Sequence, residues 1–438
     1  MVVIGIVGGG ISGLATHHYC QQAGGSSVLW EADSEPGGAM RSRTFDGRVL
    51  DCGPQRMRLT PPLRTLIEDA GIADAVIEAA DVPIYMHHAG SLREVPRSLR
   101  SAIATDLLSW RGKARLLAEP LIGAQPSPGE SVLAYFRRTC GDEFATRIAG
   151  PLYAGLYASD PTAMPVEHSL ARALERFGVH RSILLRMLRA GVRGAEPPPV
   201  VSFTEGMAAL PVALAEQYPA STRLETPVRS ITRETDGFAI ETDRETTVVE
   251  QVVLTTPADV TAELIREIDR PSAEALAGLT YNPLVIVHIL ADTDLVGSGH
   301  HVTYPPETVT QGVTWNDSLF GDHPGRNGVY TCFLGGAARP DVTDWDDDEL
   351  GKRAATEFEL MTGHAAEPIS VCTLSRAMPA YDHTWDAFDR VSLPDGIHLC
   401  GNFVDRAGIP GRVMHAQRVA SHITSATGMP TDGQQPPA

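Results

Sequence analysis

The chain has 438 residues, more than one ordinary hydrophobic core accommodates, and this length predicts two or three domains in an enzyme-sized unit. Hydrophobic residues make up 43% and charged residues 21% of the chain, a globular composition that excludes wholesale disorder. The formal net charge of −18 argues against a nucleic-acid partner, because phosphate binding needs a basic surface.

The N-terminal segment has the order of a dinucleotide-binding βαβ unit. An apolar strand over residues 2–7 leads into the glycine turn Gly8–Gly13, which opens a helix. A second strand over residues 28–30 follows, with Glu31 at its end. This order predicts that a pyrophosphate binds at the N-terminus of the helix, where N–H groups are free and the helix dipole is positive.

Three glycines of the turn have separate roles in such a unit. Gly8 permits the tight turn, Gly10 lets the pyrophosphate approach the backbone, and Gly13 lets the helix pack closely on the strand. A lone G-x-G-x-x-G is weak evidence, but here the flanking elements agree, and Glu31 lies 18 residues beyond Gly13 to meet the ribose hydroxyls. The alternative for the glycine segment is a purely structural turn, and the alternative for Glu31 is an ordinary surface carboxylate.

The stretch after Glu31 distinguishes FAD from a nicotinamide. The paired glycines Gly37 and Gly38 and the basic residue Arg41 resemble the second signature of the flavin-containing amine oxidase superfamily. In that superfamily this loop carries backbone and a cation past the FAD pyrophosphate. The alternative for the paired glycines is a flexible turn.

The next part of the chain alternates between strand and helix patterns. Residues 42–60 read as a strand that feeds a glycine-proline turn at Gly53 and Pro54. Residues 61–80 read as helical, and residues 96–195 as a helical block with amphipathic spacing. Prolines 197–199 end that block.

The second half returns to strands. A helix ending at Gln217 precedes two short strands. Further strands follow, then a helix that begins with acidic residues, and finally a closing helix. The predicted strands are 228–231, 238–242, 252–257, 281–291, 328–336 and 397–400, and the acidic segment 341–362 continues as a helix. Residues 426–438 are polar and proline-rich, which predicts a frayed tail.

Several short motifs, in order along the whole chain, resemble the protoporphyrinogen oxidases. The segments that carry this resemblance are Gly150–Pro161, Phe203–Pro211, Phe333–Ala337, Ala377–Tyr381 and Gly401–Arg418. The first is similar to the family's G-x-Y-A-G-D-P segment with a short insertion, and the last to its C-terminal flavin segment. Motifs in the right order are more specific than any one of them.

The resemblance implies an α/β, two-domain FAD-binding Rossmann-type fold with a mixed-sheet substrate domain and a helical insertion. It also implies a set of FAD contacts. In this set Val228 contacts the adenine through its backbone atoms. For Trp385 the alternative is an ordinary packed aromatic without a cofactor contact. The set is Gly8, Gly9, Gly10, Ile11, Ser12, Gly13, Glu31, Ala32, Gly38, Ala39, Arg41, Gly53, Pro54, Gln55, Arg56, Val228, Trp385, Gly401, Asn402, Gly408, Ile409 and Pro410.

The domain boundaries follow from the same reading. The FAD-binding domain is predicted in three parts, the substrate domain in two, and a helical cap or membrane-facing insertion between them. The FAD-binding parts are 1–80, 201–257 and 371–425, the substrate-domain parts are 81–95 and 258–370, the insertion is 96–200, and the tail is 426–438.

The resemblance implies an oxygen-using oxidase that converts a porphyrinogen to a porphyrin in haem biosynthesis, by a six-electron aromatisation in three flavin cycles that each return hydrogen peroxide. The substrate is protoporphyrinogen or coproporphyrinogen. A two-electron FAD-dependent oxidase or desaturase of a specialised metabolite is the alternative enzyme, and a flavin-binding protein without turnover is the alternative outside enzymes. No catalytic base can be read from the sequence.

Two departures from family patterns bear on the substrate. Amine oxidases of the superfamily usually place a lysine near the flavin N5, and residues 281–289 contain none, which disfavours an amine oxidase. Tetrapyrrole-oxidising relatives usually place a propionate-binding arginine ahead of the aromatic before the helical domain, and residues 81–85 contain none. Arg93 and Arg97 are candidates to replace it, with solvated surface charges as the alternative.

The six cysteines are scattered without a C-x-x-C pair, and we expect reduced thiols rather than a disulfide framework or a zinc site. The adjacent histidine pairs do not predict a metal site. No stretch reaches the roughly 18 apolar residues of a membrane-spanning helix. We expect a cytoplasmic protein, and residues 176–189 mix basic and apolar residues in a way that suits either peripheral membrane contact or a soluble cap. The oligomeric state cannot be read from the sequence.

Overall fold

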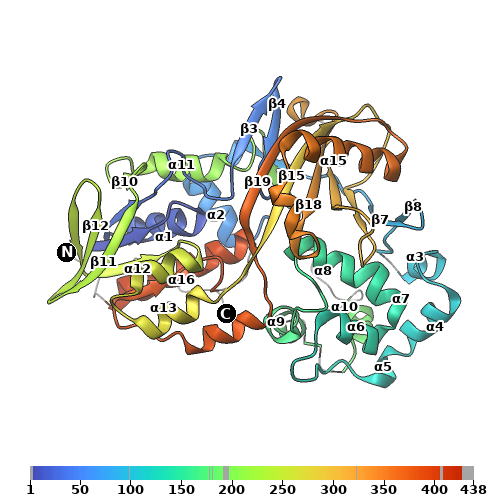
Figure 1. Ribbon diagram of the computed structural model, residues 1–438, viewed down its shortest axis with the longest axis horizontal. Coiled ribbons are helices and arrows are strands. Elements are labelled where there is room, and N and C mark those ends of the chain that lie inside the picture. The colour runs from blue at the N-terminus through green and yellow to red at the C-terminus, as the bar shows by residue number, and fades with distance from the viewer. Residues whose placement is uncertain are drawn as a thin grey trace.

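The computed structural model describes residues 3–97, 99–176, 178–179, 181–190, 197–321, 323–404 and 408–426. Two sheets with different strand arrangements organise the chain, and a block of helices lies beside the second sheet (Figure 1). The predicted tail from residue 427 on, and part of the basic-apolar stretch 176–189, lie outside the described residues.

The first sheet has five parallel strands in the order β10-β2-β1-β14-β20. Chain segments from the beginning, middle and end of the sequence therefore build one sheet, as a Rossmann-type fold requires. The strands are β1 Val3–Val7, β2 Ser26–Trp30, β10 Thr222–Arg223, β14 Gln251–Leu254 and β20 Ile397–Leu399.

Each face of this sheet buries a separate apolar core. On one face the strands pack against four helices, with Leu14, Leu63, Leu210 and Val413 among the buried contacts. On the other face they pack against a small antiparallel sheet and two helices. The first set is α1 Ile11–Gln22, α2 Pro61–Asp69, α11 Ala209–Gln217 and α16 Ile409–Ala426, and the second is β11 Val228–Glu234, β12 Gly237–Thr242, β13 Thr246–Val249, α12 Ala258–Ile265 and α13 Arg270–Ala277.

The second sheet has seven strands in the order β19-β15-β18-β17-β16-β7-β8, and it is mixed because only the β16–β7 pair is parallel. The helix α15, Asp347–Thr362, covers one of its faces. The strands are β7 Ile84–His88, β8 Ser91–Glu94, β15 Tyr281–Leu290, β16 Gly299–Val302, β17 Thr310–Trp315, β18 Val329–Gly335 and β19 Glu367–Pro379.

The helical block lies between β8 and the next strand in the sequence, and its own core includes Leu133, Tyr135 and Val166. Its helices are α3 Leu99–Ala104, α4 Trp110–Leu117, α5 Glu119–Ile122, α6 Val132–Cys140, α7 Asp142–Phe144, α8 Gly150–Tyr157, α9 Ala171–Arg176 and α10 Ile183–Ala190. None of the helices in the described part of the chain is both long and apolar enough to cross a membrane.

Smaller elements join these units. They are the hairpin β3 Ser42–Phe45 and β4 Arg48–Asp51, the three-stranded sheet of β5 Met57–Arg58, β9 Val200–Phe203 and β6 Val76–Glu78, and the helix α14 Asn316–Phe320. The helix predicted over 61–80 is shorter than expected: α2 ends at Asp69, since Gly71 takes a φ of +74° there, and β6 follows.

The predicted fold class, a two-domain FAD-binding type with a mixed sheet and a helical insertion, is confirmed by these sheets and by the structural relatives given below. The predicted domain boundaries remain predictions. Two features of the packing cross them: α12 and α13 share a core with the parallel sheet, and β19 extends the mixed sheet to Pro379.

Candidate active site

The glycine turn lies at the carboxyl edge of the parallel sheet. A Cβ atom on Gly13 would collide with the carbonyl oxygen of Gly8, so only glycine lets α1 pack this closely on β1. A Cβ atom on Gly10 would meet no protein atom within 4 Å, so the N-terminus of α1 opens onto free space. A helix N-terminus that is backed by glycines and open in front fits a pyrophosphate.

Glu31 follows β2 at the same edge and is tied to the glycine turn. Its carboxylate accepts a hydrogen bond from the backbone N–H of Gly9, and its other oxygen accepts one from the N–H of Asp33 at 2.9 Å. The side chain is half-buried. The structure therefore places the predicted ribose-binding acid beside the open helix end.

The loop after Glu31 packs onto the turn. Gly37 donates its N–H to the carbonyl oxygen of Gly9 at 2.8 Å, and Ala32, Gly38 and Ala39 are exposed around the turn. A Cβ atom on Gly53 would collide with the carbonyl oxygen of Ala39, so the segment after β4 also approaches this loop closely. The basic residue of the loop, Arg41, forms an ion pair with Asp33.

The C-terminal residues of the predicted set reach the same edge. Because β1, β2, β14 and β20 are parallel, the segments that follow them meet at one end of the sheet. Gly401 and Asn402 come after β20, and Asn402 accepts a hydrogen bond from the hydroxyl of Tyr281 at 2.9 Å. Gly408 immediately precedes α16, Ile409 and Pro410 begin that helix, and Val228 begins β11.

Trp385 packs in an aromatic cluster at the edge of the parallel-sheet core. Its ring centroid is 4.2 Å from that of Tyr381, and the Tyr381 ring is 5.2 Å from that of Tyr157 in α8. This packing agrees with the alternative of an ordinary packed aromatic, and its contact with a cofactor remains a prediction.

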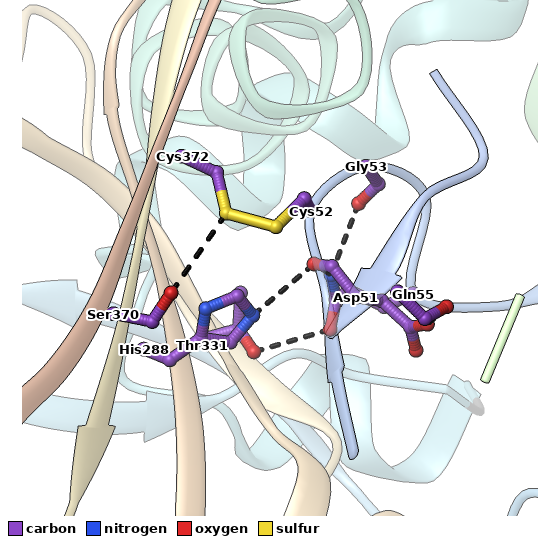
Figure 2. The surroundings of a disulfide bond; sticks show 9 residues. Asp51, Cys52, Gly53, Gln55, His288, Thr331, Ser370 and Cys372 are labelled. Carbon is purple, nitrogen blue, oxygen red and sulfur yellow. Dashed lines mark hydrogen bonds between the residues drawn. A yellow bond between two sulfur atoms is a disulfide. The ribbon is translucent and has the colours of Figure 1, made fainter. Parts of the chain in front are cut away.

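The prediction that all cysteines are reduced is wrong for one pair. Cys52 and Cys372 form a disulfide between the end of β4 and the strand β19 (Figure 2). The two residues are 320 positions apart, so no local spacing motif could identify them, and only the packing of β4 against the mixed sheet brings them together. Cys20, Cys140, Cys332 and Cys400 are buried and form no disulfide within the described part of the chain.

A buried polar network lies beside the disulfide, and within it both amide atoms of the Gln55 side chain form hydrogen bonds. The Gln55 amide nitrogen donates to the carbonyl oxygens of Asp51 at 2.7 Å and Gly53 at 3.0 Å. Its amide oxygen accepts from Asn316 and Thr331, both at 3.1 Å. Gln55 thus fixes the predicted FAD segment to the mixed sheet, and only its backbone remains for a cofactor.

Asp51 anchors the same segment through a buried ion pair. Its carboxylate lies 2.8 Å from the guanidinium of Arg326, and both side chains are at most 1% exposed. The other carboxylate oxygen accepts hydrogen bonds from Ser42 at 2.6 Å and from the N–H of Met207 at 2.8 Å. Nothing in the sequence pairs these distant residues, and this anchor was not predicted.

The mixed sheet presents two different faces, because neighbouring side chains on a strand point in opposite directions. We call the face toward Asp51 and Cys52 the front face and the face under α15 the back face. The strand register places on the front face Leu284, Ile286, His288, His301, Thr331, Phe333, Cys372 and Leu374. The back face carries Val285, Val287, Ile289, Cys332 and Leu334.

Apolar residues of the front face keep accessible surface. Leu284, Phe333 and Leu374 are half-buried and pack around the buried side chain of Ile286 and the disulfide. The His288 ring is fully buried beside Asp51, and its burial lowers its pKa to about 4. The front face is therefore a largely apolar, partly accessible surface next to the segment Gly53–Arg56.

The two arginines proposed to replace the family's propionate-binding residue both have carboxylate partners, although the strand register places Arg93, opposite Met86, on the front face. Arg97 forms an ion pair with Asp81 at 2.6 Å, and Arg93 forms one with Asp106. Arg97 is 47% exposed, so its guanidinium already has a carboxylate partner at the surface.

The comparisons with known proteins agree with this geometry. A model of the family described as flavin containing amine oxidoreductase matches residues 11–424. The chain is 29% identical over 476 residues to protoporphyrinogen oxidase 1, chloroplastic, from Arabidopsis thaliana, covering 96% of this chain and 87% of that protein. It is 21% identical over 448 residues to the coproporphyrinogen III oxidase of Bacillus subtilis, covering 92% and 94%.

Solved structures share the fold. A candidate protoporphyrinogen oxidase from Exiguobacterium sp. 255-15 superimposes with a TM-score of 0.80 at 23% identity, covering 97% of this chain and 99% of that one. A reduced UDP-galactopyranose mutase superimposes with a TM-score of 0.73 at 15% identity, covering 99% and 97%.

Proposed function

Since the chain belongs to the flavin-containing amine oxidoreductase family and is thereby an FAD-dependent oxidoreductase, we propose that it oxidises a porphyrinogen to a porphyrin with molecular oxygen. The observation that carries this proposal is the front face, which offers an apolar and partly accessible surface beside the predicted FAD segment Gly53–Arg56. The names of the relatives from Arabidopsis thaliana and Bacillus subtilis supply the substrate class.

The residues of the front face also disfavour amine oxidation. The strand β15, Tyr281–Leu290, carries no lysine, and its front-face residues near the disulfide are Leu284 and Ile286. An apolar surface of this kind suits a flat, hydrophobic macrocycle better than a protonated amine.

Bound FAD would supply the hydride acceptor, and the protein would position it and exclude water. We propose that the open N-terminus of α1 holds the pyrophosphate and that Glu31 reaches the ribose. The segment Gly53–Arg56 would hold the flavin end of the cofactor against the mixed sheet, because Gln55 and the disulfide fix that segment there.

Gly10→Ala tests the cofactor part of the proposal. A methyl group on Gly10 would meet no protein atom but would occupy the space given to the pyrophosphate, so the chain should fold while FAD binding weakens by at least about tenfold. The measurement is FAD content and affinity by flavin absorbance. Gly278→Ala, whose Cβ atom would lie 3.4 Å from the nearest atom, is the matched control and should retain FAD. Unchanged FAD affinity in Gly10→Ala would contradict this placement.

An aerobic assay tests the reaction. Purified protein is mixed with protoporphyrinogen or coproporphyrinogen, and porphyrin fluorescence and hydrogen peroxide are followed together. Flavin-dependent porphyrin formation faster than autoxidation is the expected result, and the rates rank the two substrates. Bound FAD without such a rate would reject the porphyrinogen proposal and favour a two-electron oxidase or desaturase of another metabolite, the alternative suggested by the missing arginine in residues 81–85.

We also propose that the helical block touches a membrane surface. Large apolar side chains on α3, α4 and α5 are exposed, and the ammonium of Lys113 lies 4.6 Å from the Trp110 ring centroid. Those exposed side chains are Ile103, Trp110, Leu117, Leu121 and Ile122. Co-sedimentation with anionic vesicles should be lost in a Trp110→Ser, Leu121→Ser variant, and equal sedimentation of wild type and variant would reject the contact.

A further inference from the structure

Arg56 carries a positive charge that the described residues do not neutralise. Its side chain is half-buried, and its one recorded hydrogen bond is a long contact of 3.5 Å from the guanidinium to the carbonyl oxygen of Ser298. Among the described residues, no carboxylate forms an ion pair with it. Burial and the nearby charge of Arg58 lower the Arg56 pKa, as expected for a desolvated cation without an anion. Such a charge is costly unless a ligand compensates it.

His301 lies beside Arg56 on the front face and is also incompletely satisfied. Its Nδ1 atom is buried without a hydrogen-bond partner among the described residues. Gly155 of α8 approaches this nitrogen so closely that it could not carry a side chain without displacing the ring, and a Cβ atom on Gly312 of β17 would lie 3.1 Å from the same nitrogen. Burial and the charge of Arg56 lower the His301 pKa to about 4, so the imidazole is neutral near pH 7.

The two residues lie toward the β16 side of a surface with the opposite character. His301 pairs with Gly312, Gly312 with Phe333, and Phe333 with Ile286, so His301 and the apolar residues belong to the same face of one sheet. Leu284, Phe333 and Leu374 occupy the other end of this row. The front face thus joins an apolar surface to a half-buried cation that has no ion-pair partner among the described residues.

We propose that the Arg56 guanidinium binds a carboxylate of the substrate at the β16 end of the front face, with the neutral His301 ring lining the same position. This inference rests on the proposed function and specifies its substrate as an apolar molecule with a carboxylate at its rim. The backbone of Arg56 still belongs to the segment proposed to hold FAD, and only its side chain is assigned to the substrate. Arg56, in the segment between β4 and β5, then replaces the cation that residues 81–85 lack.

The geometry favours Arg56 over Arg93, Arg97 and Arg326. Arg93 and Arg97 already have carboxylate partners, and Arg326 is paired with Asp51. A bidentate arginine-carboxylate pair inside the protein is stronger than one at the surface, because water competes less with it.

The experiment measures equilibrium binding to the FAD-loaded protein, with the product coproporphyrin and its tetramethyl ester as probes. Binding is followed by quenching of protein fluorescence, and FAD content by absorbance. In Arg56→Gln we expect coproporphyrin affinity to fall about 10- to 100-fold, with ester affinity and FAD content unchanged. Arg56→Lys should restore part of the affinity, and Arg97→Gln is the matched control that should behave as wild type.

The outcomes separate this inference from the function on which it rests. Equal coproporphyrin affinity in wild type and Arg56→Gln, with porphyrinogen turnover intact, would overturn the assignment of Arg56 and leave the function standing. Loss of FAD from both Arg56→Gln and Arg56→Lys would assign the guanidinium to the cofactor instead and also overturn the inference. A wild-type protein that neither binds coproporphyrin nor oxidises its porphyrinogen would overturn both proposals.

Discussion

The front and back faces of the mixed sheet are built by the same strands but have different environments. On the back face Val285, Val287 and Leu334 are fully buried under α15, where they pack against Phe358. On the front face Leu284 and Phe333, each next to one of those residues in sequence, keep accessible surface. Alternation along a strand therefore separates the residues that stabilise the sheet from those available to a substrate.

The polar groups on the front side of the sheet also fall into two kinds, those paired within the protein and one cation without a carboxylate partner in the described part of the chain. The front face and its border carry the buried network of Gln55 and Thr331, the ion pair of Asp51 and Arg326, and the unpaired Arg56. The first two are paired within the protein and hold the FAD-side segment to the sheet, whereas Arg56 has no carboxylate partner among the described residues. We infer that the paired groups on this side have a structural role and that the unpaired cation marks the ligand.

The largest effect is expected when the buried ion pair of Asp51 and Arg326, which anchors the segment beside the front face, is broken. Arg326→Met leaves the Asp51 carboxylate buried without its cation, so the free energy of unfolding should fall by about 3–5 kcal/mol. Urea denaturation measures this loss. Arg229→Met removes the exposed ion pair with Asp243 and should not change the unfolding midpoint measurably. A loss in Arg326→Met as small as that of this control would show that the anchor does not stabilise the interface.

A matched pair on one strand compares the two faces directly. Leu334→Ala on the back face opens a cavity in a fully buried core and should lower the free energy of unfolding by about 3 kcal/mol, with activity per bound flavin unchanged. Phe333→Ala on the front face should cost less stability but raise the KM for the porphyrinogen. Denaturation and steady-state kinetics of both variants test the division, and the reverse pattern would contradict it. Leu360→Ala is the control for shortening a leucine side chain without opening a cavity, because Leu360 lies on α15 and is 74% exposed.

The smallest expected effect concerns pH and the back face. Burial and its histidine neighbours lower the pKa of His300 from 6.5 to about 3, so within this window the unfolded chain binds a proton that the folded chain does not. Stability should therefore fall as pH decreases from 6.5, by about 2 kcal/mol between pH 6.5 and pH 5 for this one group. His300→Gln should reduce the difference between denaturation curves at about pH 7 and about pH 5, since its amide oxygen can still accept from Trp315. An unchanged difference would show that His300 is not the group responsible.

The glycine turn and Glu31 could be predicted from the sequence because their chemistry is local. Gly10, Gly13 and Glu31 lie where the βαβ pattern places them, since a strand, turn and helix are adjacent in the chain. The front face could not be found in this way. Its strands β16, β17 and β19 were not predicted, and its pattern depends on pairing between segments far apart in sequence.

The same distinction explains which side chains were misjudged. Arg93 and Arg97 were candidates by position, and their partners Asp106 and Asp81 become visible only in the folded chain. The absence of a C-x-x-C pair predicts a reduced Cys52, and this prediction fails because its partner lies 320 residues away. Arg56 was placed in the FAD segment by resemblance, but the surroundings of its guanidinium are set by β16.

The disulfide turns most of the chain into a covalent ring. The link between Cys52 and Cys372 encloses the helical block, all but the last residues of the mixed sheet, and the strands β10 and β14 of the parallel sheet. The helices α1 and α16 lie on the two open ends and pack against each other outside the ring. A protease that cuts once within the ring, in the exposed helical block for example, would therefore yield a nicked protein that migrates as one molecule until a reductant separates the fragments.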